Sequence, residues 1–122
     1  DESLLKKTLF DTEYAKVLIA EYDGEPAGMA LYFHSYSTFL GKPGIYLEDL
    51  YVKEKFRGNG LGKGLLKKLA EICDENDFGR LEWSVLDWNK PSIDFYESLG
   101  ADSQDEWIKY RVTGDTLKKL SE

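Results

Sequence analysis

The spacing of apolar residues changes sharply in the middle of the chain. From Ile45 to Val52 apolar and aromatic residues form a run, interrupted by Glu48 and Asp49, that suits a pleated surface and predicts a β-strand. From Leu61 onward apolar residues recur every three or four positions, which predicts one stripe of an amphipathic helix. Between these two elements lies the glycine-rich stretch Arg57-Gly58-Asn59-Gly60-Leu61-Gly62.

The rest of the chain alternates predicted strands with predicted helices. Asp23-Gly24 is a hairpin signal, Gly28 is a candidate bulge and Gly100 is a helix stop. This order indicates an α/β layered domain, a mixed central sheet flanked by helices. The further strands are expected at Ala15–Tyr22, Ala27–Tyr36, Arg80–Leu86 and Glu106–Val112, and the further helices at Ser3–Phe10, Pro91–Leu99 and from Thr113 or Asp115 to Leu120.

Length and composition predict a single domain spanning residues 1–122 with a modest core. The only cysteine, Cys73, lies on the apolar stripe of the central helix, which favours a buried thiol and excludes an internal disulfide. With one histidine, His34, beside that single cysteine, a conventional zinc site is not expected, and we predict no metal.

The formal net charge of −7 argues against nucleic acid as a partner and suits a cationic small molecule, although simple solubility also explains it. No run is long and apolar enough to span a membrane, and no signal peptide is visible at Asp1. The sequence therefore predicts a cytoplasmic protein with no membrane or nucleic-acid partner.

A glycine-rich turn that opens a helix is suited to bind an anion, because the first helical N–H groups have no partner within the helix. A plain flexible loop is the alternative. A Walker A loop is excluded because Gly62-Lys63 is followed by Gly64 instead of serine or threonine. A G-x-G-x-x-G dinucleotide fingerprint also fails, since its last position falls on Lys63 or Leu65.

The pattern that does fit is Arg57-x-x-Gly60-x-Gly62, which resembles the acyl-CoA pyrophosphate loop of the GNAT superfamily of N-acyltransferases. The resemblance implies that acetyl-CoA is the cosubstrate. Its pantetheine arm would meet the main chain of the preceding strand, and its pyrophosphate would meet the loop. The cofactor-binding residues implied are Leu50, Tyr51 and Val52 for pantetheine, and Arg57, Gly58, Asn59, Gly60, Leu61 and Gly62 for the pyrophosphate.

A second segment, Asn89 to Gly100, resembles the other diagnostic GNAT motif, Asn-x-x-Ala/Ser-x-x-Phe-Tyr-x-x-x-Gly. The resemblance covers Ala15 to Leu120 and narrows to the diamine branch, the spermidine/spermine and thialysine N-acetyltransferases. It implies a single-domain GNAT fold and a homodimer. Because such domains normally open with another strand and helix, the chain is expected to lack the usual first strand, which could also leave its amine site incomplete.

The expected reaction is attack of a neutral amine on the acetyl thioester, which needs a proton acceptor and a proton donor. By resemblance Tyr96 is the general acid, whereas a packed core tyrosine beside Phe95 is the alternative. Glu48 would bind the cationic amine and relay its proton. Asp49 would bind the amine or make a structural hydrogen bond, and a solvent-exposed edge is the alternative for both carboxylates.

The remaining candidates each keep two interpretations. Asn89 and Ser92 would contact the CoA arm, or Asn89 caps the helix and Ser92 sits in its first turn. Phe39, Asp105 and Trp107 would line an amine pocket, in this chain or in a dimer partner, or belong to the core or an interface. The predicted function is acetyl transfer to a small cationic amine such as a polyamine, diamine or lysine-like compound. The alternatives are a non-catalytic acyl-CoA-binding fragment and a peptide or protein acetyltransferase.

Overall fold

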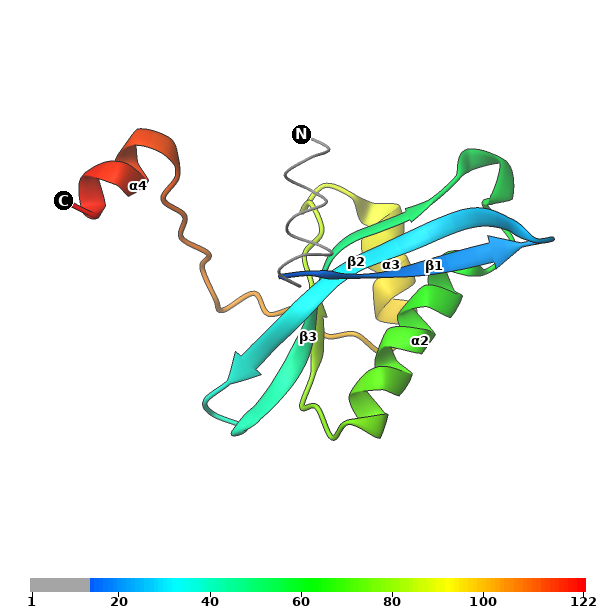
Figure 1. The fold of residues 1–122 in the computed structure, drawn as a ribbon, viewed down its shortest axis with the longest axis horizontal. Helices are drawn as coiled ribbons and strands as arrows, with labels where there is room; N and C mark the ends of the chain where they lie inside the picture. Colours follow the sequence, from blue (N-terminus) through cyan, green and yellow to red (C-terminus); the bar gives the residue numbers. More distant parts are fainter. Residues whose placement is uncertain (1–13) are drawn as a thin grey trace. The chain divides into compact units, whose positions relative to one another are not determined.

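The computed structural model describes residues 14–122, which fall into two compact units that divide after Ser84 (Figure 1). The first unit holds the sheet and its long helix, and the second holds two shorter helices. The predicted helix Ser3–Phe10 lies outside the described residues. A single domain over residues 1–122 stays a prediction.

The first unit is built on a mixed sheet whose strands follow the order β1-β2-β3-β4. The first three strands pair antiparallel, and β4 pairs parallel with β3. This confirms the α/β class with a mixed central sheet. The strands are β1 (Lys16–Tyr22), β2 (Glu25–Ser37), β3 (Lys42–Val52) and β4 (Leu81–Trp83).

The turn between β1 and β2 forms where the sequence predicted it. Asp23 and Gly24 both adopt positive φ, 51° and 77°, as a tight hairpin turn matched to the twist of its strands requires. The register of β1 against β2 shifts between Ala20 and Glu21, opposite Gly28 and Pro26, so the irregularity expected at Gly28 lies beside it.

The helix α2 (Leu61–Glu75) covers one face of this sheet and follows a short 3-10 turn, η2 (Glu54–Phe56) (Figure 1). Its predicted stripe forms the core together with apolar residues from β2 and β3. Burying such side chains is the main favourable term in folding. The buried apolar residues are Leu65, Leu66, Leu69 and Cys73 from α2, and Ala27, Ala30, Tyr32, Ile45 and Leu47 from the sheet.

The second unit contains α3 (Lys90–Ser98) and α4 (Gly114–Leu120), close to the predicted bounds. The helix α3 stops before Gly100, whose φ of +92° suits glycine. The strand predicted at Glu106–Val112 was wrong, because that segment is irregular and extended pairing needs a neighbouring strand. The strand predicted at Arg80–Leu86 is shorter than expected and is reduced to β4.

Candidate functional site

The strand β3 is paired along one side but only partly along the other. On the β2 side its pairing runs from Lys42 to Val52, whereas β4 reaches only Ile45 to Leu47. In the first unit, residues 14–84, no strand lies beside Leu50–Val52 on the β4 side. Main-chain groups there are arranged to pair with an extended ligand.

A β-bulge in β3 lies at the candidate carboxylates. Tyr32 faces Leu47 and Leu31 faces Asp49, so Glu48 is an extra residue without an opposite partner on β2. A bulge re-aims side chains and interrupts the alternation of a strand. Adjacent residues of a regular strand point to opposite faces, but the bulge interrupts this alternation at Glu48 and Asp49. Both side chains are exposed.

The turn that follows β3 is anchored by a phenylalanine that sequence reasoning missed. Phe56 is buried, with its ring centroid 5.5 Å from that of Tyr22. Beside it, Lys55 donates a 2.8 Å hydrogen bond to Glu25, and this ammonium lowers the pKa of the Glu25 carboxyl. In the sequence, the only sign of this buried side chain is that Phe56 is the one aromatic residue in a charged, glycine-rich stretch.

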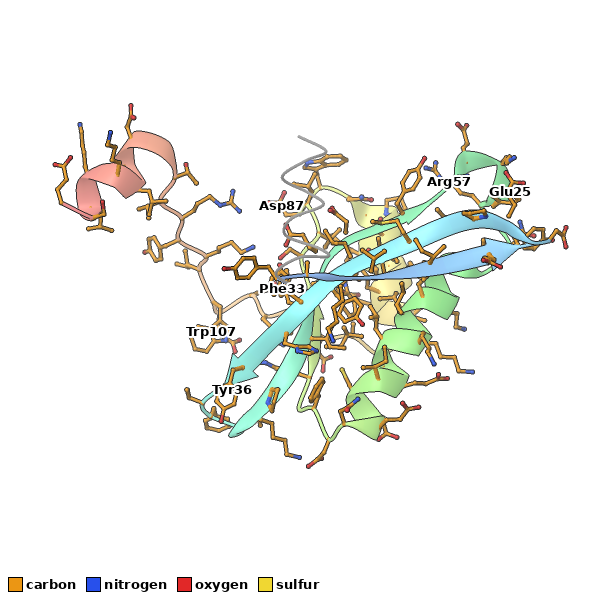
Figure 2. The ribbon with its side chains drawn as sticks, in the orientation of Figure 1. Glu25, Phe33, Tyr36, Arg57, Asp87 and Trp107 are labelled. Atoms are coloured by element: carbon orange, nitrogen blue, oxygen red, sulfur yellow. The ribbon has the colours of Figure 1, made fainter. Side chains whose placement is uncertain are left out.

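Arg57 ties the glycine loop to the end of β3. Its Nε donates to the Val52 carbonyl at 3.0 Å, and its guanidinium carbon lies 5.9 Å from the centre of the Tyr51 ring. Figure 2 shows Arg57 at the same end of the sheet as Glu25. The hydrogen bond from the Arg57 side chain to the Val52 carbonyl joins the glycine loop to the last residue of β3, so Arg57 helps to shape the loop.

The start of α2 has the properties of an anion site. Gly58 and Gly60 adopt φ of +87° and +77°, and a side chain at either position would meet nothing within 4 Å. Gly60 caps the helix without a side-chain hydrogen bond, and the first turn holds no acidic residue. The first N–H groups and the positive end of the helix dipole are thus left for an external acceptor.

In the second unit, Asn89 caps α3. Its Oδ1 accepts a 3.3 Å hydrogen bond from the backbone N–H of Ser92, so the helix-capping interpretation is present in the structure. Tyr96 lies farther along α3, is half-buried, and has its ring centroid 5.6 Å from that of Phe95. Burial raises the pKa of the Tyr96 phenol, which therefore keeps its proton at neutral pH.

The other substrate candidates come from both units. Phe39 is 96% exposed in the turn between β2 and β3, and the six residue steps from Lys42 to Glu48 span roughly 20 Å of strand between that turn and the bulge. In the second unit, Asp105 accepts a 3.1 Å hydrogen bond from Ser103, and Trp107 is exposed. The roles of these three residues at an amine pocket stay predictions.

Residues 14–122 contain no group of three histidine, cysteine or acidic side chains placed to hold a metal ion. None of the helices in this part of the chain is long and apolar enough to cross a membrane.

Comparisons with known proteins agree on the family. A family profile described as "Acetyltransferase (GNAT) family" matches residues 1–101. Thialysine N-epsilon-acetyltransferase of Bos taurus is 38% identical over 99% of this chain and 77% of its own length. L-ornithine N5-acetyltransferase of Arabidopsis thaliana is 44% identical over 77% of this chain, which spans only 41% of that relative.

A solved structure extends the likeness to the fold. An integron cassette protein from the mobile metagenome of V. cholerae superimposes with a TM-score of 0.86 and 30% identity. The superposition covers 100% of this chain and 78% of that one. The sheet, the glycine loop and α2 therefore belong to a shared architecture.

Proposed function

Because this chain belongs to the GNAT family of acetyltransferases, we propose that it transfers an acetyl group from acetyl-CoA to a primary amine of a small cationic substrate. Its membership of the N-acetyltransferases, on the diamine branch, follows from relatives that carry that name. Relatives named for thialysine and for ornithine make a lysine-like or diamine substrate the first choice. Polyamines are the next class to test.

The observation that carries this proposal is the unpaired end of β3, which leads directly into the glycine loop and α2. Leu50–Val52 would pair through their main chain with the pantetheine arm. Gly58–Gly62 would hold the pyrophosphate with backbone N–H groups, within a loop shaped by Arg57 and Phe56. The residues present therefore fit acetyl-CoA, which when bound supplies the activated acyl thioester.

Two side chains carry the proposed chemistry. Glu48 binds the ammonium of the substrate and accepts a proton from it, directly or through water, which leaves a neutral amine to attack. Tyr96 keeps its phenolic proton because burial raises its pKa, and it donates that proton from Oη to the departing sulfur. The N–C bond forms as the C–S bond breaks, and the nitrogen then loses its second proton, which restores the Tyr96 phenol, so charge and protons balance.

The other site residues have supporting roles in this proposal. Asn89 holds the start of α3 and, with Ser92, contacts the CoA arm. Asp49 adds a second negative charge for the amine next to Glu48. Phe39, Asp105 and Trp107 would line the amine pocket, in this chain or in a dimer partner.

The test is release of free CoA thiol from acetyl-CoA with spermidine, spermine, thialysine, ornithine, lysine and a basic peptide. We expect turnover with at least one small amine, and a loss in kcat of about 100-fold or more in Tyr96→Phe because the proton donor is gone. Glu48→Gln should lose kcat/KM through both amine binding and proton transfer. Tyr36→Phe, which removes an exposed hydroxyl on β2, is the matched control and should keep full activity.

Three results would contradict the proposal. Full activity in Tyr96→Phe would remove Tyr96 from the acid role. Binding of acetyl-CoA without turnover on any amine would favour a non-catalytic acyl-CoA-binding fragment, whereas turnover on the peptide alone would favour a peptide acetyltransferase.

A further inference from the structure

Two aromatic rings lie together on the face of the sheet that points away from the core. Phe33 of β2 and Tyr46 of β3 are directly paired in register, and their stacked rings have centroids 5.3 Å apart. The adjacent pair, Tyr32 and Leu47, is buried in the core that α2 covers. Because successive side chains of a strand point to opposite faces, Phe33 and Tyr46 lie on the other face. Phe33, labelled in Figure 2, is 37% exposed, so part of its ring is open to a ligand.

A hydrogen bond holds this aromatic pair, Phe33 and Tyr46, in place. The hydroxyls of Tyr46 and Ser84 lie 2.6 Å apart, and Ser84 directly follows β4. Phe33 in turn packs against the anchored Tyr46 ring, with 29° between the two ring planes. Rings that are ordered before binding lose little freedom when a ligand arrives, so the aromatic pair is suited to bind one.

The register of β3 brings a carboxylate to the same face. Leu31 lies two residues before Phe33 on β2, so the two side chains share a face, and Leu31 is paired with Asp49. Two residues span roughly 7 Å of strand. Glu48, the extra residue of the bulge, precedes Asp49, and both carboxylates are exposed. Among residues 14–122, no lysine or arginine forms an ion pair with either of them.

The charged groups beside the aromatic pair compensate each other. Glu82 of β4 is paired in register with Tyr46, and it forms a 2.8 Å ion pair with Arg80. The negative charge that remains for a ligand is therefore at the bulge, on Glu48 and Asp49.

Aromatic rings distinguish cations from anions. The face of each ring carries partial negative charge, so it attracts an ammonium group and disfavours a carboxylate. A linear diamine can place one ammonium at Glu48 and Asp49 and its second ammonium at the rings. In an amino acid such as lysine, a carboxylate lies next to the second ammonium and opposes its attraction to the rings.

We propose that Phe33 and Tyr46 bind the second ammonium of a diamine whose first ammonium lies at Glu48 and Asp49, and that this aromatic pair selects diamines over amino acids such as lysine. The inference rests on the proposed acetyl transfer, since it names the residues that select the amine for that reaction.

Isothermal titration calorimetry in the presence of free CoA, which cannot donate an acetyl group, tests the selection without turnover. The amines are 1,5-diaminopentane, pentylamine and lysine, which share a chain of five carbons between the amine and the remote end. We expect the parent chain to bind 1,5-diaminopentane more tightly than the other two. In Phe33→Leu the ratio of the dissociation constants of pentylamine and 1,5-diaminopentane should fall about fivefold, because leucine keeps apolar contact but has no ring to attract a cation.

Two further variants separate the ring from other effects. Tyr36→Leu also removes an exposed ring from β2, but three residues along the strand and so on the opposite face, and it should leave the ratio unchanged. Tyr46→Phe keeps both rings and loses only the hydrogen bond to Ser84, so its ratio should fall less than that of Phe33→Leu.

Each contrary result would overturn the proposal. These results are an unchanged ratio in Phe33→Leu, an equal fall in Tyr36→Leu, a larger fall in Tyr46→Phe, and lysine bound as tightly as 1,5-diaminopentane by the parent chain. A diamine that binds with the expected ratios but releases no CoA thiol from acetyl-CoA would contradict acetyl transfer and support the aromatic pair. Turnover with an unchanged ratio in Phe33→Leu would do the reverse, so the two proposals fail separately.

Discussion

Single glycines set how closely the strands of the first unit approach one another. A Cβ at Gly28 would lie 2.8 Å from the Tyr51 carbonyl oxygen, and one at Gly44 would lie 2.7 Å from the Arg80 carbonyl oxygen. Neither residue adopts positive φ, so close approach alone accounts for glycine there. Gly28 matters more for function, because Tyr51 belongs to the unpaired end of β3 that we assign to pantetheine.

Replacing Gly28 by alanine should therefore affect both stability and cosubstrate binding. The new methyl group cannot be accommodated without moving the backbone of β3, and we expect a loss of about 1–3 kcal/mol in the free energy of unfolding. The KM for acetyl-CoA should rise as well. Gly64→Ala in α2 is the control, because a Cβ there meets nothing within 4 Å and alanine favours a helix by about 0.5–1 kcal/mol. Urea denaturation and steady-state kinetics measure the two effects, and equal stability changes in both variants would contradict the steric argument.

At the scale of elements, local signals predicted most of this fold. The change of period at Leu61 predicted α2, and Asp23-Gly24 fixed the first hairpin. The bulge at Glu48 was not predictable in this way, because it is a register shift that depends on Leu31 and Tyr32 in another strand. The anchor at Phe56 likewise depends on Tyr22, which is distant in sequence.

The predicted strand at Glu106–Val112 failed for a related reason. Composition and alternation describe what a segment can form, whereas a strand also needs a neighbour to satisfy its backbone groups. The strand β4 is short in the same sense, since only Leu81–Trp83 pairs with β3, at Ile45–Leu47. Strand pairing depends on two segments that are distant in sequence, so the residues of one segment alone cannot predict whether it pairs.

The cap of α3 allows the two interpretations of Asn89 to be separated. Asn89→Ala should destabilise the start of α3 by about 1 kcal/mol, because the N–H of Ser92 loses its acceptor. Asn89→Asp retains a capping oxygen and should restore stability. If Asn89 also contacts the CoA arm, Asn89→Asp should still raise the KM for acetyl-CoA, since it places a negative charge beside an anionic ligand. Equal KM values for Asn89→Asp and the parent chain would leave capping as its only role.

For the whole molecule, net charge acts oppositely on the two proposed ligands. A chain of −7 attracts a cationic amine from a distance and repels the phosphates of acetyl-CoA. The start of α2 offsets this repulsion locally, because it combines the positive end of the helix with Lys63 and no acidic residue in the first turn. Glu48 and Asp49, both exposed at the bulge, add to the attraction of the amine.

Salt should therefore weaken the capture of a doubly charged amine more than that of a singly charged one. Raising the ionic strength from about 0.01 M to 0.15 M shortens the screening length from roughly 30 Å to 8 Å. At saturating acetyl-CoA, we expect kcat/KM for 1,6-diaminohexane to fall several-fold, and that for hexylamine, matched in length with one charge fewer, to fall less. An equal fall of kcat/KM for both amines would contradict this prediction, because it would mean that the second positive charge adds nothing to the long-range attraction by the protein. Glu48 and Asp49 would then contribute to amine selection only through direct contact.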